Sequence, residues 1–186
     1  MLTEIQRLQM LQGPEKPADM VLDTDAYNEI DDQYAIAYAM KAEEKLRLKA
    51  FYAAPFHNEN SSGPADGMER SYNEILHLLR LMDRQAPVLC GSDSFLANET
   101  TPVLSPAAED LAARAMQYTW ENPLYVVAIG AITNIASALL IRPEIADRIV
   151  IVWLGGHAVH MPKAASEFNM RQVLLFGQDG CANRLR

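Results

Sequence analysis

Short apolar runs alternate with longer amphipathic stretches along almost the whole chain. The continuous apolar runs predict buried strands, and they cover residues 20–22, 48–54, 87–90, 124–129 and 149–154. Stretches with apolar residues at helical spacing predict helices, and they cover residues 1–12, 31–46, 67–82, 106–120 and 133–140. Strands that alternate with helices indicate an α/β fold, an open and mostly parallel sheet with helices on both faces. In such sheets the ligand crevice lies beyond the carboxyl ends of the strands, so the residues after each strand are the first candidates for function.

Composition narrows the class of protein. The 186 residues predict a single domain, residues 1–186. The net charge of −8 argues against nucleic-acid or anionic-membrane partners, because phosphate contacts need clustered Lys and Arg. Two cysteines, Cys90 and Cys181, exclude a disulfide framework and indicate a cytoplasmic location. The N-terminus has no signal-peptide pattern, and no run of about 18 apolar residues predicts a membrane span.

An acidic cluster directly follows the first predicted strand. Five carboxylates fall within ten residues there: Asp23, Asp25, Glu29, Asp31 and Asp32. Like charges at short range resist ionising together unless a cation neutralises them. A helix N-terminus offsets only about 0.3–1 kcal/mol per charge. An all-oxygen ligand set suits calcium or magnesium, so the cluster predicts a divalent cation site. The competing interpretation is a solvated acidic loop in which Asp31 is a helix N-cap.

Two known acidic motifs explain this segment poorly. A calcium-binding EF-hand loop that starts at Asp23 needs Gly at its sixth position and Glu at its twelfth, where this chain has Asn28 and Tyr34. A haloacid-dehalogenase-like phosphatase also begins with Asp-x-Asp after a first strand. That motif leaves Asp31 and Asp32 unexplained, and the phosphatase is kept as a less favoured alternative.

Residues 22–25 (Leu-Asp-Thr-Asp) and 31–36 (Asp-Asp-Gln-Tyr-Ala-Ile) together resemble the N-terminal signature of the nucleoside hydrolases, of the inosine-uridine preferring type. The turn between them is two residues longer than in the commonest form of the family. Further segments match the family's motifs in the same order. They are Phe-His-Asn at 56–58, Ile-Gly-Ala-Ile-Thr-Asn-Ile-Ala at 129–136, Trp-Leu-Gly-Gly at 153–156 and Ser-Glu-Phe-Asn at 166–169.

The resemblance implies a nucleoside hydrolase-like fold and an N-ribosyl hydrolase of purine and pyrimidine salvage. Such an enzyme splits a ribonucleoside into ribose and free base with a water activated by Ca²⁺. A homo-oligomer is also expected. The implied metal ligands are Asp25, Asp32 and the backbone carbonyl of Ile129, with Asp25 also the catalytic general base. The implied ribose-binding residues are Asp31, Asn58, Glu167 and Asn169. Asp23 would support Asp25 in a hydrogen-bond network.

The chain departs from the family in two places. The loop before Glu167 carries His160 and Met161 where the family has an Asn. Residues 173–186 form an atypical tail, and the family continues further with a final calcium-binding Asp, for which Asp179 lies too early. We therefore expect a fold that is incomplete at its C-terminal end and has low activity, or a non-catalytic homologue that binds metal or ribose. Apolar surface from the strands of Val126 and Val152 would then be exposed and favour self-association.

Overall fold

The computed structural model describes residues 2–158 and 160–174. They form a five-stranded, all-parallel sheet in the order β3-β2-β1-β4-β5. The strands are Ala18–Thr24 (β1), Leu46–Ala53 (β2), Val88–Cys90 (β3), Leu124–Ala128 (β4) and Ile149–Trp153 (β5). The strand order reverses between β1 and β4, which is where open α/β sheets place their ligand crevice. The predicted parallel α/β sheet is confirmed.

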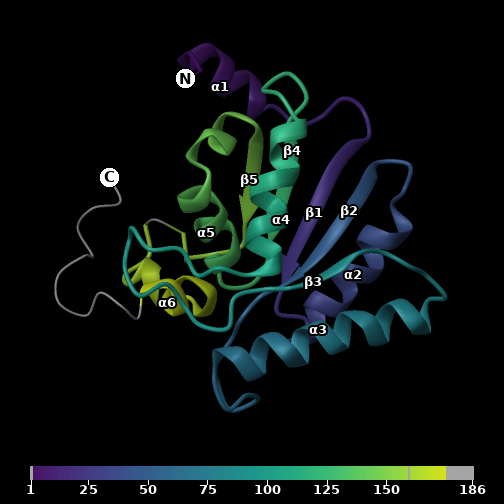
Figure 1. Ribbon diagram of the computed structural model, residues 1–186, viewed down its shortest axis with the longest axis vertical. Helices are drawn as coiled ribbons and strands as arrows, with labels where there is room; N and C mark the ends of the chain where they lie inside the picture. Colours follow the sequence, from purple (N-terminus) through teal and green to yellow (C-terminus); the bar gives the residue numbers. More distant parts are fainter. Residues whose placement is uncertain (1, 159, 175–186) are drawn as a thin grey trace.

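Helices cover both faces of the sheet. The helices are Glu4–Met10 (α1), Ile30–Lys41 (α2), Pro64–Leu81 (α3), Pro106–Arg114 (α4), Thr133–Ile141 (α5) and Phe168–Leu174 (α6). Figure 1 shows the strands running from the end of the molecule near α1 towards the end near α6. The carboxyl ends of the strands therefore meet beside α6. No helix in the described part of the chain has the length and apolarity that a membrane span needs.

The sheet separates two apolar cores, because successive side chains of a strand point to opposite faces. On one face Tyr52 of β2 and Val126 of β4 pack with α4 and α5. On the other face Leu22 of β1 and Phe51 of β2 pack with α2 and α3. Strands buried on both faces read as continuous apolar runs, which is why the sequence pattern located them.

Two predicted helices end five or six residues earlier in the structure than in the sequence pattern. The helix expected over residues 31–46 ends at Lys41, and Leu46 instead opens β2, where it pairs with Ala18 of β1. The helix expected over residues 106–120 ends at Arg114 and continues as the 3₁₀ turn Ala115–Gln117. A backbone bridge between Thr119 and Asn122 then turns the chain into β4. Tertiary pairing overrides helical spacing at both places.

One edge of the sheet carries exposed apolar side chains. On the edge strand β5, Val152 is 51% exposed and Ile151 is 36% exposed, and Leu154 just beyond it is also exposed. The face of the sheet that α2 covers has an apolar groove of about 430 Å³ between α2 and the end of β4. The exposed rings of Tyr34 and Tyr38 border it. The expected exposed apolar surface is therefore present on β5. On the strand of Val126, β4, the Val126 side chain is fully buried beneath α4 and α5, and the partly exposed apolar side chain is Val127, which lines the groove.

Candidate functional site

The acidic cluster lies at the carboxyl end of β1, where the strand order reverses. The chain leaves β1 at Thr24 and makes a tight turn in which the backbone N–H of Asn28 donates to the carbonyl of Asp25 at 2.7 Å. Helix α2 then begins at Ile30 with Glu29 as its N-cap. The interpretation of Asp31 as the N-cap is wrong: it lies inside the first turn of α2, and its Oδ1 accepts the backbone N–H of Asp32 at 3.1 Å.

Three of the five carboxylates are buried beside one another. Asp23, Asp25 and Asp32 are 0%, 1% and 5% exposed. Asp32 reaches back from α2 to β1, where the hydroxyl of Thr24 donates to its Oδ1. No Lys or Arg of the described residues forms an ion pair with any of the three. The other two acidic residues, Glu29 and Asp31, lie exposed at the rim.

Burial raises the pKa of all three carboxyl groups. It raises the pKa of Asp32 to about 7, to which the nearby charge of Asp31 contributes. Burial also raises the pKa of Asp23 to about 7, although a hydrogen bond from Asn134 opposes the shift. The pKa of Asp25 rises well above its usual range because of burial and the neighbouring charge of Asp32. Ionising these three carboxyl groups together is therefore unfavourable, and a bound cation would relieve that cost.

The end of β4 forms the opposite wall of this site. The backbone N–H of Ile129 donates to the carbonyl of Asp23 at 2.9 Å. The next residue must be glycine, because a Cβ at Gly130 would lie 2.7 Å from Oδ1 of Asp25 and 2.9 Å from the Cβ of Ala54. The carbonyl of Ile129 accepts the Nδ2 amide of Asn169 at 2.9 Å. A carbonyl has two lone pairs, so one remains for another partner.

Glu167 uses its carboxylate to hold the backbone of α6. Its Oε2 accepts the backbone N–H groups of Gly156 at 2.7 Å and Met170 at 3.0 Å, and its Oε1 accepts that of Asn169 at 2.9 Å. Burial opposes ionisation, yet these backbone donors outweigh it and hold the pKa of Glu167 below its usual range. Asn169 is only 6% exposed and donates Nδ2 to the carbonyls of Ile129 and Leu154. These two residues therefore join α6 to the ends of β4 and β5.

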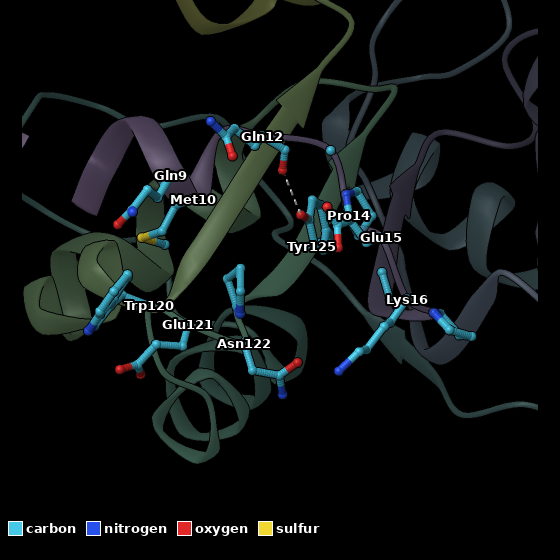
Figure 2. A pocket seen from close by; sticks show the side chains of 14 residues that line it. Gln9, Met10, Gln12, Pro14, Glu15, Lys16, Trp120, Glu121, Asn122 and Tyr125 are labelled. Atoms are coloured by element: carbon cyan, nitrogen blue, oxygen red, sulfur yellow. Dashed lines mark hydrogen bonds between the residues drawn. The ribbon is translucent and has the colours of Figure 1, made fainter. Parts of the chain in front are cut away.

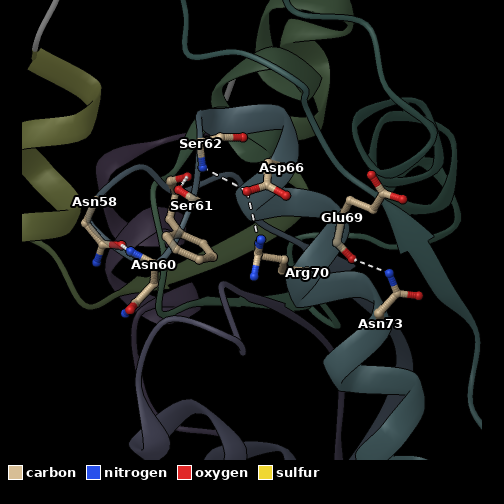
Figure 3. A network of polar contacts seen from close by, with 9 residues as sticks. Asn58, Asn60, Ser61, Ser62, Asp66, Glu69, Arg70 and Asn73 are labelled. Carbon is tan, nitrogen blue, oxygen red and sulfur yellow. Dashed lines mark hydrogen bonds and ion pairs between the residues drawn. The ribbon is translucent and has the colours of Figure 1, made fainter.

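Asn58 comes from the loop after β2 and reaches the acidic turn indirectly. Its Nδ2 donates to Oδ1 of Asn28 at 2.7 Å, and Nδ2 of Asn28 donates to Oδ2 of Asp25 at 3.0 Å. Oδ1 of Asn58 accepts the backbone N–H of Asn60 at 2.9 Å, which closes the start of the loop (Figure 3). The structure thus connects Asn58 to Asp25 through Asn28.

Three residues that support the carboxylates were not assigned roles from the sequence: Thr24, Asn28 and Asn134. Asn134, fully buried near the start of α5, donates Nδ2 to Oδ2 of Asp23 at 2.8 Å and to the carbonyl of Ala53 at 3.2 Å. Its Oδ1 accepts the backbone N–H and the hydroxyl of Ser92. Its position in the Thr-Asn turn of residues 129–136 was one available signal. For Asn28 the signal was an amide three residues after Asp25, the spacing of a turn that hydrogen-bonds back to an acidic residue.

The donor atoms fit a hard divalent cation, although they supply only part of its coordination. Asp25, Asp32 and the carbonyl of Ile129 provide oxygen donors, and Ca²⁺ takes 6–8 such ligands. Among the residues that the structure describes, no group of three or more His, Cys, Asp or Glu side chains is arranged to hold a metal ion. His160 is exposed, and Asp179 lies outside the described residues.

A second depression lies at the other end of the sheet. Its volume is about 310 Å³, and residues 9–18 and 120–125 line it at the amino ends of β1 and β4. Figure 2 shows the hydroxyl of Tyr125 donating to the carbonyl of Gln12 across this depression, at 3.5 Å. Because the strands run away from it, this depression is separate from the acidic site.

Comparisons with known proteins agree with this arrangement. The model of a family described as inosine-uridine preferring nucleoside hydrolase matches residues 20–172. Similar solved structures are a purine-preferring ribonucleoside hydrolase from Gardnerella vaginalis, a plant nucleoside hydrolase and an inosine-guanosine nucleoside hydrolase. Their TM-scores are 0.64, 0.62 and 0.64, and their sequence identities are 24%, 24% and 21%. At sequence identities this low, the structural similarity shows a shared fold and no more. The search of curated proteins found no match to the chain.

The matches also differ in length. The three structures cover 83%, 84% and 82% of this chain, whereas the chain covers 54%, 54% and 52% of theirs. The chain therefore spans about half the length of the solved structures it matches. Within that half, the nucleoside hydrolase-like α/β fold predicted from the sequence is confirmed.

Proposed function

Because the chain belongs to the inosine-uridine preferring nucleoside hydrolase family, we propose that it binds a ribonucleoside beyond the carboxyl ends of β1 and β4 and hydrolyses its N-glycosidic bond. The products are ribose and the free base. One observation carries the proposal: the buried carboxylates of Asp25 and Asp32 meet where the strand order reverses and have no cationic partner among the described residues. The family assignment also removes the reason to prefer a phosphatase.

Asp25 is the proposed general base. Its Oδ2 accepts the amide of Asn28, whereas Oδ1 faces Gly130, and we assign to Oδ1 the proton of the attacking water. In the proposed complex the ribose lies beside the carboxylates of Asp25 and Asp32. Their negative charge would then stabilise the positive charge that develops on the ribose during cleavage.

Asp25, Asp32 and the carbonyl of Ile129 would hold a calcium ion. When bound, the ion lowers the pKa of water and fixes the ribose diol. Calcium is preferred to magnesium here because the set combines carboxylates with a backbone carbonyl and leaves further positions for oxygen atoms of substrate and solvent.

The proposed ribose contacts follow from which polar atoms remain available. Asp31 is exposed at the rim of the site and can accept from ribose hydroxyls. Both Nδ2 protons of Asn169 go to backbone carbonyls, so this residue contacts ribose only through Oδ1. Glu167 already accepts three backbone donors, but a carboxylate has about four acceptor positions, so one remains. Asn58 completes the set from the loop after β2.

A second candidate function is binding of metal or ribose without turnover. The buried carboxylates of Asp25 and Asp32 would serve it equally, because holding an ion or a ribose diol needs no general base. Measurable turnover separates hydrolysis from binding alone. We expect hydrolysis that is slower than the roughly 1–10³ per second of ordinary enzymes. For the proposed nucleoside hydrolase we also propose self-association, a cytoplasmic location and a role in nucleoside salvage.

The test is a nucleoside hydrolysis assay on the full chain with calcium or with a chelator. Inosine, guanosine, uridine and cytidine are compared with the matching 2′-deoxynucleosides. We expect slow, calcium-dependent release of base from ribonucleosides and much less from their 2′-deoxy forms. Asp25→Asn should abolish release, whereas the matched control Asp93→Asn, on the exposed loop after β3, should retain it. Calcium binding with no release from any substrate supports the second candidate, and equal turnover of both sugar types overturns the assignment to the ribose diol.

A further inference from the structure

The turn between β1 and α2 contributes a side chain that touches two residues of the site at once. Nδ2 of Asn28 donates to Oδ2 of Asp25 at 3.0 Å, and Oδ1 of Asn28 accepts Nδ2 of Asn58 at 2.7 Å. The backbone N–H of Asn28 also donates to the carbonyl of Asp25 at 2.7 Å. Asn28 is thus tied to Asp25 through both its backbone and its side chain.

These contacts determine how the amide of Asn28 is oriented. Rotating the amide by half a turn would place Oδ1 against the carboxylate of Asp25 and Nδ2 against the amino group of Asn58. Both hydrogen bonds would be lost and replaced by repulsive contacts. Asn58 therefore selects the orientation in which Asn28 offers a donor to Asp25.

The two oxygens of Asp25 consequently have different surroundings. Oδ2 is held by Asn28, whereas Oδ1 faces Gly130, whose missing side chain leaves it room. A hydrogen bond to one oxygen restricts rotation of the carboxylate, so the other oxygen keeps a fixed direction. Because Asp25 is almost fully buried, bulk water does not compete for the held oxygen.

The turn and the loop beside it are braced by α3. The guanidinium of Arg70 lies 5.3 Å from the ring centre of Tyr27, the residue before Asn28. Nε of Arg70 donates to Oδ2 of Asp66 at 3.0 Å, and that oxygen also accepts the backbone N–H of Ser62 at 2.8 Å. Figure 3 shows this network running from α3 to the loop that carries Asn58. These contacts connect α3 both to the residue before Asn28 and to the loop that carries Asn58.

We propose that Asn28 is a positioning residue, which holds Oδ2 of Asp25 through an amide oriented by Asn58 and thereby directs Oδ1 towards the attacking water. The inference rests on the proposed function, in which Asp25 is the general base. It assigns the longer turn of this chain a part in arranging the catalytic carboxylate.

The kinetic test compares Asn28→Ala and Asn28→Asp with wild type. Asn28→Ala removes both hydrogen bonds, and Asn28→Asp keeps the acceptor for Asn58 but replaces the donor to Asp25 with an acceptor. Misplacing a catalytic group typically costs about 10²-fold in rate, so we expect kcat to fall roughly 10–100-fold while KM stays within about threefold. The matched control is Asn73→Ala on α3, whose amide contacts only the carbonyl of Glu69 among the described residues. If kcat of Asn28→Ala stays within about threefold of wild type, at a temperature where both are folded, the proposal is wrong.

A second measurement does not depend on activity. In the ¹H–¹⁵N spectrum, the side-chain amide signal of Asn28 should move when Asp25→Ala removes its acceptor, and move again in Asn58→Ala. The amide signal of Asn73 should stay unchanged in both variants. If wild type hydrolyses no nucleoside, the proposed function fails and the catalytic role of Asn28 fails with it, whereas this spectrum still shows whether the amide of Asn28 holds Asp25. An Asn28 signal that ignores Asp25→Ala overturns it.

Discussion

Two groups of carboxylates at the same end of the sheet have opposite environments. Asp23, Asp25 and Asp32 are buried together and have raised pKa values, and each accepts one side-chain hydrogen bond. Glu167, a short distance away beside β4 and β5, accepts three backbone N–H groups and has a lowered pKa. Both positions bear the same functional group, so the difference comes from the donors that surround it.

The comparison separates a prepared site from a structural contact. Three backbone donors fill most of the acceptor positions of the Glu167 carboxylate and hold α6 against the ends of the strands, which leaves about one position for the proposed contact with ribose. The aspartates are left under-compensated, with Oδ1 of Asp23 buried and without a hydrogen-bond partner in the described part of the chain. Natural proteins keep such costly groups mainly where a ligand or a reaction uses them.

The largest expected effect follows from replacing Asp25. Asp25→Asn should lower kcat by several orders of magnitude, because it removes a metal ligand as well as the roughly 10²–10⁴-fold contributed by a general base. It should also abolish the rise in melting temperature with millimolar calcium. Glu167→Gln should retain that rise. The hydrolysis assay measures kcat, and calorimetry with and without calcium measures the melting temperatures of both variants. A wild type that melts identically in the two conditions contradicts the metal assignment.

The next effect concerns binding of ribose at the rim. Asp31→Asn should weaken substrate binding and rate together by about 10–100-fold, since a hydrogen bond to a charged group contributes roughly 1.5–3 kcal/mol. The 2′-deoxy substrate should lose a similar factor with wild type and less with the variant. Steady-state kinetics on both sugars tests this double difference, and additive losses would separate Asp31 from the diol.

The buried aspartates and Glu167 should also change the stability of the fold with pH in opposite directions. The folded-state pKa values of Asp23 and Asp32, about 7, lie above the unfolded value of 3.8, so the protonated forms stabilise the fold. Without calcium, this stability is complete below about pH 4 and declines as pH rises towards about 7, by roughly 1.4 kcal/mol per pH unit for one such group. The contribution of Glu167 is present above its unfolded pKa of 4.5 and is lost as pH falls through its lowered folded value.

Denaturant unfolding from pH 4 to pH 8 measures this difference. Asp32→Asn should flatten the decline between about pH 4 and pH 7, whereas Glu167→Gln should leave that decline in place and remove stability mainly above about pH 4.5. A wild type without calcium whose stability rises steadily across this range would contradict the raised pKa values.

The smallest expected effect is at the exposed edge of the sheet. Val152→Lys should reduce self-association, because a lysine on an edge strand disfavours pairing with another chain. Its effect on the unfolding free energy should stay within about 0.5 kcal/mol, as for most surface substitutions. Light scattering at high protein concentration provides the measurement. A wild type that remains a monodisperse monomer would exclude this surface as an association site.

The sequence determined the layout of the sheet well. Strands buried on both faces leave continuous apolar runs, so β1, β2, β4 and β5 were recognisable without the structure. Their boundaries were less certain, as at Leu46, because an apolar residue at helical spacing can equally start a strand. The local pattern cannot tell whether such a residue continues the helix or pairs with a neighbouring strand.

The sequence also determined where the chemistry lies, because five carboxylates after a buried strand must crowd together and because the motifs of residues 22–36 and 129–136 keep the order of the family. It could not determine how each carboxylate is compensated. The backbone donors to Glu167, the amide of Asn134 on Asp23 and the link from Asn58 through Asn28 to Asp25 join residues up to 111 positions apart along the chain. Only tertiary folding brings such donors within hydrogen-bonding distance, and they decide how much of each carboxylate remains available to a ligand.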